Sequence, residues 1–79
     1  MPTIFIVDGF RFFFFSNEGR EPIHVHVEKA EKYAKFWVKP ISSAYNYKFN
    51  QVELNRIRKI MEDHRREIEE KWNEFFSID

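Results

Sequence analysis

One alternating stretch decides the fold of this chain: Pro22-Ile23-His24-Val25-His26-Val27-Glu28. Successive side chains of a β-strand point to opposite faces, so the two imidazoles and Glu28 share one surface while the aliphatic residues share the other. The aliphatic side predicts contact with a core. The polar side supplies the first candidate functional residues. The residues before and after this stretch indicate where the strand lies in the sheet.

An aromatic hairpin is predicted before this stretch. Residues 3–7 are rich in β-branched and aromatic side chains, and they are followed by Asp8-Gly9, a dipeptide typical of two-residue type I′ turns. The second strand, over residues 10–16, is aromatic on both faces, which predicts a strand that is covered on both sides.

Two further strands complete the predicted sheet. Residues 23–28 form the histidine strand, and residues 33–38 alternate again, with Ala34, Phe36 and Val38 on one face. Because consecutive strands usually pair, we predict a four-stranded antiparallel meander. Residues 41–48 are predicted to be an irregular connection.

A long helix is predicted over residues 51–76. Asn50 is a favourable N-cap, and Glu53 completes a capping-box pattern. A helix of this length would extend roughly 39 Å, which is longer than a small sheet is wide, so we expect an overhang or a bend, with Asp63-His64 the preferred position. Its apolar stripe is formed by Leu54, Ile57, Met61, His64, Ile68, Trp72 and Phe75.

The predicted architecture is therefore α+β, a single domain over residues 1–79 with one helix across one face of the sheet. The residues expected to meet the helix are Ile4, Ile6, Phe12, Phe14, Val25, Val27, Phe36 and Val38. The residues expected on the opposite face are Phe5, Phe13, Phe15, His24, His26, Tyr33 and Trp37, with Arg11 and Lys35 among them.

This opposite face is predicted to be an interaction surface, because a single helix cannot cover both sides of an aromatic sheet. Its expected binding residues are Phe13, Phe15, Tyr33, Lys35 and Trp37. We expect the protein to associate, either with a second copy or with another small protein.

Composition limits the classes of function. The 79 residues include no cysteine, and 13 Lys and Arg balance 13 Asp and Glu. The absence of cysteine fits a reducing cytosol, and a neutral chain lacks the basic excess of a typical nucleic-acid binder. The apolar start has no basic leader and is too short to span a bilayer, so we expect a cytoplasmic protein without a membrane segment.

Four polar residues are candidates for catalysis: His24, His26, Arg11 and Glu28. Imidazoles titrate near neutrality and a guanidinium can stabilise an anion, a combination that suits a metal-independent nuclease. The alternative that we favour is a structural one, in which the imidazoles are hydrogen-bonded and packed against Trp37 or Tyr33.

The same histidines are the only metal candidates that we consider. At positions i and i+2 of a strand, His24 and His26 have Cα atoms about 6.5 to 7 Å apart, close enough to share an ion. A third ligand would have to be Glu28 or His64, and His64 lies on the helix stripe. We therefore expect neither a physiological metal nor a cofactor.

Several of these features together resemble a known family. They are the Met1-Pro2-Thr3-Ile4 start, the Pro-x-His-x-His-Val element at 22–27, the alternating strand after it, and the helix that ends in Trp72-Asn73-Glu74-Phe75-Phe76. The chain resembles the small prokaryotic family catalogued as domain of unknown function number four-one-six-zero. Many relatives have Pro-Pro-His before the second histidine, whereas Glu21-Pro22-Ile23 precedes His24 here.

The resemblance implies a genetic context and no catalytic role. Members of the family are commonly encoded beside another small protein, an arrangement like that of a toxin-antitoxin pair. Two hypotheses follow. The first is a protein-interaction component of such a two-gene module, acting through the aromatic sheet face. The second is a small RNA-directed enzyme that uses His24, His26 and Arg11.

Overall fold

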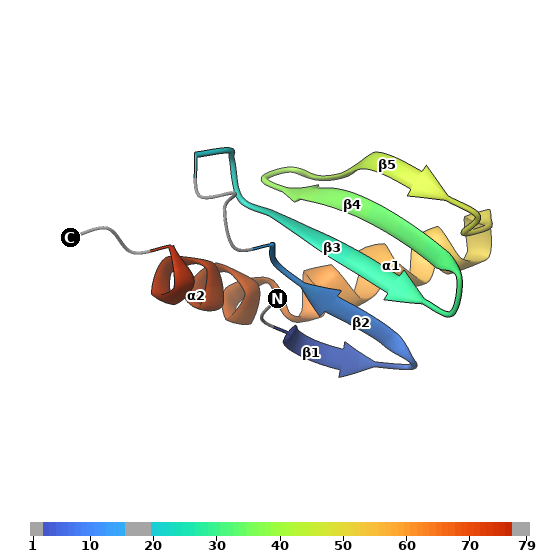
Figure 1. Ribbon diagram of the computed structural model, residues 1–79, viewed down its shortest axis with the longest axis horizontal. Coiled ribbons are helices and arrows are strands. Elements are labelled where there is room, and N and C mark those ends of the chain that lie inside the picture. The colour runs from blue at the N-terminus through green and yellow to red at the C-terminus, as the bar shows by residue number, and fades with distance from the viewer. Residues whose placement is uncertain (1–2, 16–19, 77–79) are drawn as a thin grey trace.

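Five antiparallel strands and two helices make up the protein. The computed structural model describes residues 3–15 and 20–76, and the statements below concern these residues. The strands are β1 (Thr3–Val7), β2 (Phe10–Phe13), β3 (His24–Lys29), β4 (Lys32–Val38) and β5 (Ile41–Tyr47), and they form one sheet in the order of the sequence. The α+β class and the meander are confirmed, and both helices lie on one side of the sheet (Figure 1).

The fifth strand corrects the prediction of four. β5 covers the segment that was predicted to be irregular, and it pairs with β4 from Val38↔Ile41 to Tyr33↔Tyr47. Its Ser and Asn residues have low strand propensity, but an open edge of β4 provides backbone partners that outweigh this preference. The ladder also contains a register shift between Lys35 and Phe36.

The other strand boundaries differ from the prediction by a few residues. β2 ends at Phe13, whereas the predicted strand continued to residue 16, which lies outside the described residues. β3 and β4 each extend to include a lysine at their shared turn. The Asp8-Gly9 turn is as predicted, because both residues have positive φ, 54° and 81°, and Val7 pairs with Phe10 across it.

The predicted single helix is two helices, α1 (Gln51–Asp63) and α2 (Arg65–Phe75). The break is at His64, within the Asp63-His64 pair where a bend was expected. Its φ of −113° and ψ of 18° leave helical geometry, although Ile68 still donates to the His64 carbonyl. The imidazole of His64 packs on Phe5 of β1, with ring centroids 4.6 Å apart, so the break holds α2 against the β1 end of the sheet.

The core lies between the sheet and the two helices. Phe12, Val25, Val27, Ala34, Phe36, Val38, Ile57, Met61 and Ile68 are completely buried there. The expected face assignment is wrong for two residues of β1: Phe5 packs against the core, whereas Ile6 is 64% exposed. A register shift between Thr3 and Phe5 causes the exchange, because an additional residue in a strand reverses the faces of its neighbours.

Two contacts connect α1 to the turns of the sheet. Asn50 and Glu53 form the predicted capping box, with Glu53 N to Asn50 Oδ1 at 2.8 Å and Asn50 N to Glu53 Oε1 at 3.0 Å. Glu53 also accepts from Lys32, the first residue of β4 after the β3–β4 turn, at 2.5 Å. Arg56 pairs with Asp8 of the β1–β2 turn.

In the described part of the chain, no helix has the length and apolar character needed to cross a membrane.

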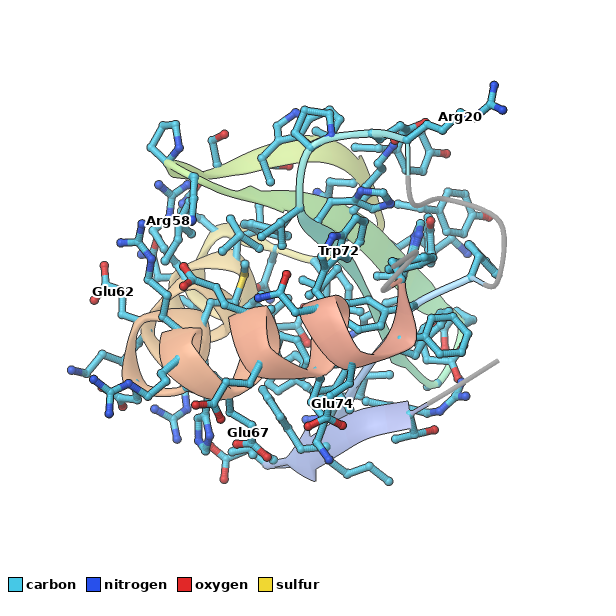
Figure 2. The ribbon with its side chains drawn as sticks, turned by 90° about the vertical axis from the view of Figure 1, so that its left-hand side faces the viewer. Arg20, Arg58, Glu62, Glu67, Trp72 and Glu74 are labelled. Atoms are coloured by element: carbon cyan, nitrogen blue, oxygen red, sulfur yellow. The ribbon has the colours of Figure 1, made fainter. Side chains whose placement is uncertain are left out.

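The burial of Trp72 predicts a large contribution to stability. This side chain points from α2 toward the sheet (Figure 2) and is 6% exposed, in contact with Phe14 and Phe76. Truncation of a buried aromatic side chain usually costs about 3 to 5 kcal/mol, so we expect Trp72→Ala to lower the free energy of unfolding by that amount. Urea denaturation followed by circular dichroism measures it. The control is Val52→Ala on α1, where Val52 is 76% exposed and the cost should stay within about 0.5 kcal/mol.

The Lys32–Glu53 pair predicts a dependence of stability on pH. The hydrogen bond from Lys32, followed by that from the Asn50 backbone, lowers the pKa of Glu53 from its ordinary value of 4.5. Because the pKa is lower in the folded protein, the ionised pair stabilises the fold above pH 4.5, and this contribution is lost as the pH falls through the folded-state value.

We therefore expect Lys32→Met to be less stable than the wild type near neutral pH, with a difference that shrinks in acid. Urea midpoints at about pH 7 and about pH 3 measure the two differences. Lys59→Met, which removes the exposed pair with Asp63, serves as the control. An equal difference between wild type and Lys32→Met at both pH values would contradict the assignment.

Candidate functional site

The two histidines of the candidate site are on β3, the middle strand of the sheet. Across the ladders, His26 faces Phe13 of β2 and Lys35 of β4, and His24 faces Trp37 of β4. The sequence places both imidazoles on the side of β3 opposite Val25 and Val27, which contact the core. We call this side of the sheet the outer sheet face. Its residues on the neighbouring strands include Phe13 on β2, Tyr33, Lys35 and Trp37 on β4, and Tyr45 and Tyr47 on β5.

Both imidazoles are buried, at 0% exposure for His24 and 2% for His26. The two rings are 5.2 Å apart at their centroids. His24 packs between Trp37 on β4, at 5.6 Å, and Trp72 on α2, at 5.2 Å. The expectation that both histidines point away from the helices is therefore wrong for His24, which is in direct contact with a helix residue.

Hydrogen bonds set the orientation of each ring. His24 Nδ1 lies 2.9 Å from the Pro22 carbonyl oxygen, which can only accept, so this nitrogen carries a proton. His26 Nδ1 lies 2.6 Å from the hydroxyl oxygen of Tyr33, and their rings are stacked at 5.8 Å. Phe13 and Phe15 also contact His26, at 5.5 and 4.3 Å. These contacts match the structural alternative from the sequence, in which the imidazoles pack on Trp37 and Tyr33.

The other two catalytic candidates, Arg11 and Glu28, are paired with each other. They face one another across β2 and β3, and Arg11 Nη1 is 2.6 Å from Glu28 Oε1. Arg11 Nε also donates to Thr3 Oγ1 at 2.9 Å, and the guanidinium lies 4.5 Å from the ring centre of Phe13. Arg11 therefore lies two residues before Phe13, the residue of β2 that pairs with His26. Its positive charge is balanced by the carboxylate of Glu28.

Aromatic and cationic side chains form the accessible part of the outer sheet face. Lys35 is 4.7 Å from the ring centre of Trp37 and 3.0 Å from a carboxylate oxygen of Glu21. Tyr45 and Tyr47 on β5 are 53% and 46% exposed. These two tyrosines were not among the expected binding residues, because residues 41–48 were predicted to be irregular. Their spacing of two residues was the available signal, since it puts both rings on one face of a strand.

A cavity lies elsewhere, between β1 and α2. It has a volume of about 300 Å³, and the described residues around it are Thr3, Ile4, Phe14, Lys71, Glu74 and Phe75. None of the four catalytic candidates lines it.

The described residues contain no cluster of three or more side chains of the metal-binding types. His64, a possible third ligand to the histidine pair, packs on Phe5 and lies 3.1 Å from Glu67 through Nδ1. Glu28, the other possible ligand, is paired with Arg11. The geometry brings neither of them to the two buried imidazoles in a metal-binding arrangement.

These features define a class of protein: a small α+β domain with a five-stranded meander, two helices on one face, and buried histidines beneath aromatic side chains on the other. The chain belongs to the family described as "Domain of unknown function (DUF4160)", which matches residues 9–73. The resemblance seen in the sequence is therefore confirmed. No curated protein and no solved structure matches the chain.

The burial of the histidines predicts a structural effect when either is truncated. His24→Ala and His26→Ala each remove a fully packed ring, and by comparison with other large-to-small core substitutions we expect a loss of about 2 to 4 kcal/mol per variant. Urea denaturation of the single variants measures it. The control is Tyr47→Ala, which removes a half-exposed ring on β5. An unchanged midpoint for both histidine variants would show that these rings are accessible in solution.

Proposed function

We propose that this protein is a protein-interaction component of a two-gene, toxin-antitoxin-like module, and that the outer sheet face binds the partner. The family resemblance supports the module. The observation that supports the surface is the group of exposed tyrosines, Tyr45 and Tyr47, beside the partly exposed Tyr33 and Trp37. Tyr and Trp are the residue types that most often anchor protein interfaces, because they bury a large area at a low cost in side-chain entropy.

The packing beneath these residues supports the same surface. His24 and His26 are held by Trp37 and Tyr33, so part of each aromatic side chain is fixed before a partner binds. A surface that is ordered in advance loses less entropy on association. The charged groups at the same surface, Lys35 and Arg11, are each paired with a glutamate, which favours contact by apolar burial over attraction of a polyanion.

The proposed partner is the small protein encoded beside this chain, and the proposed setting is the cytoplasm, in keeping with the absence of cysteine. A second copy of the chain is the competing occupant of the outer sheet face. The two occupants differ in one respect that can be measured, because only the second copy produces association when the chain is expressed alone.

The first experiment is co-expression of the tagged chain with its neighbouring gene product, followed by co-purification and growth measurements. We expect the double variant Tyr45→Ala with Tyr47→Ala to weaken partner binding by at least about tenfold, since exposed aromatic anchors dominate such interfaces. Val52→Ala, an exposed apolar residue on α1, should bind as the wild type does. Equal binding by all three proteins would place the interface elsewhere.

The second experiment is light scattering of the chain alone at micromolar concentration. Self-association that Tyr45→Asp abolishes would identify a second copy as the occupant. Tyr45 is suited to this test because it is exposed. Phe13 is 2% exposed, so a charge at that position would test folding rather than association. A wild-type monomer is the result expected if the partner is the neighbouring protein.

A further inference from the structure

A second surface, separate from the outer sheet face, is formed by β1 and α2. The cavity of about 300 Å³ lies here, with residues from β1, from α2 and from the segment after β2 around it. Figure 2 shows Glu74 on the side of α2 that is turned toward β1, and Trp72 on the side turned toward the core. The cavity therefore lies beside the packed interior and is not part of it.

The lining of the cavity combines a rigid apolar base with a charged rim. Phe14 is 1% exposed and is held by Trp72, at a centroid distance of 5.2 Å, and by Phe75, at 6.3 Å. Ile4 and the 42% exposed Phe75 add apolar walls. Lys71 and Glu74 contribute one charge of each sign. A volume near the lower end of the range for ligand sites suits one large side chain better than a cofactor.

The strand beside the cavity is at the edge of the sheet. β1 is the first strand in the order β1-β2-β3-β4-β5, so one row of its backbone N–H and C=O groups faces away from β2. The register shift between Thr3 and Phe5 places Ile4 at a bulge, a feature that commonly redirects a side chain, and here Ile4 lines the cavity. Farther along the strand, Ile6 is 64% exposed.

We propose that this surface binds an extended peptide segment of another protein, which adds a strand to the free edge of β1 and inserts one large apolar side chain into the cavity. Backbone hydrogen bonds to the outward N–H and C=O groups of β1, such as those of Ile6, would supply affinity, and the cavity would select the inserted side chain, which is the usual division of roles in β-strand addition. Lys71 and Glu74 contact the residues that flank the inserted one. The occupant is an extended peptide because no strand among the described residues pairs with the outer edge of β1 beside the cavity. A small apolar molecule would leave these backbone groups without hydrogen bonds.

The proposal is tested with a displayed library of random linear peptides. The full chain is immobilised through Ser43→Cys, on β5 at the opposite edge of the sheet, because the native sequence has no cysteine. We expect enriched peptides to share one large aliphatic or aromatic residue within an extended, β-prone sequence. Failure to enrich any peptide would overturn the proposal.

Cavity-filling variants then locate the binding site of the enriched peptides. We expect Ile4→Trp to weaken binding by at least about tenfold, whereas Val52→Trp, at an exposed position of α1, leaves it unchanged. Phe75→Lys, at a partly exposed wall residue, provides a second variant if Ile4→Trp does not fold. Peptides that bind all of these variants as well as the wild type would overturn the assignment to the cavity.

Two further measurements separate strand addition from simple insertion of a side chain. On peptide binding, amide hydrogen exchange should slow at Ile6, because Ile6 lies between the hydrogen-bonded pairs Val7↔Phe10 and Phe5↔Phe12 and its own N–H faces away from β2. Lys71→Glu should shift the enriched flanking residues toward basic types, and Glu74→Lys should shift them toward acidic types. Unchanged exchange along β1, or the same flanking preference in both charge variants, would contradict the proposal. Neither result depends on the outer sheet face or on the neighbouring gene product.

Discussion

Burial of β3 on both of its faces is the constraint on which the rest of the structure depends. Val25 and Val27 are completely buried against the helices, and His24 and His26 are almost as buried on the other side. A strand in this position needs cover from two directions, and the helices supply most of the first and, through the contact of Trp72 with His24, a part of the second. The rest of the second cover comes from aromatic side chains of β2 and β4, which pack around the imidazoles. The Nδ1 atom of each imidazole can be buried there because the Pro22 carbonyl and the Tyr33 hydroxyl provide hydrogen-bond partners.

Both proposed binding surfaces arise where this cover ends. On the outer sheet face, the aromatic layer continues past the buried histidines to Tyr45 and Tyr47, which have no described element above them. At the opposite edge, a cavity remains between β1 and α2, and Phe14 and Phe75 are among the residues around it. A chain of 79 residues has a small apolar core, and both proposed surfaces lie at its margin.

The sequence by itself determined the features that depend on neighbouring residues. Asp8-Gly9 required a hairpin because its positive φ values suit few other dipeptides, and Asn50 with Glu53 set the start of α1 through a local capping box. The alternation from residue 23 to 28 placed His24 and His26 on one face of a strand. The interruption of the apolar stripe at Asp63-His64 located the break between the helices.

Only the tertiary structure decided what depends on distant partners. β5 exists because β4 has an open edge, although its own residues favour other conformations. The register shift in β1 turned Phe5 inward and Ile6 outward, and a strict alternation of two cannot reveal such a shift. The burial of His24 depends on Trp72, which is 48 residues away in the chain, and the burial of His26 depends on aromatic neighbours such as Phe13 and Tyr33 on adjacent strands. Periodicity indicates which face a side chain shares, but only packing decides whether that face is covered.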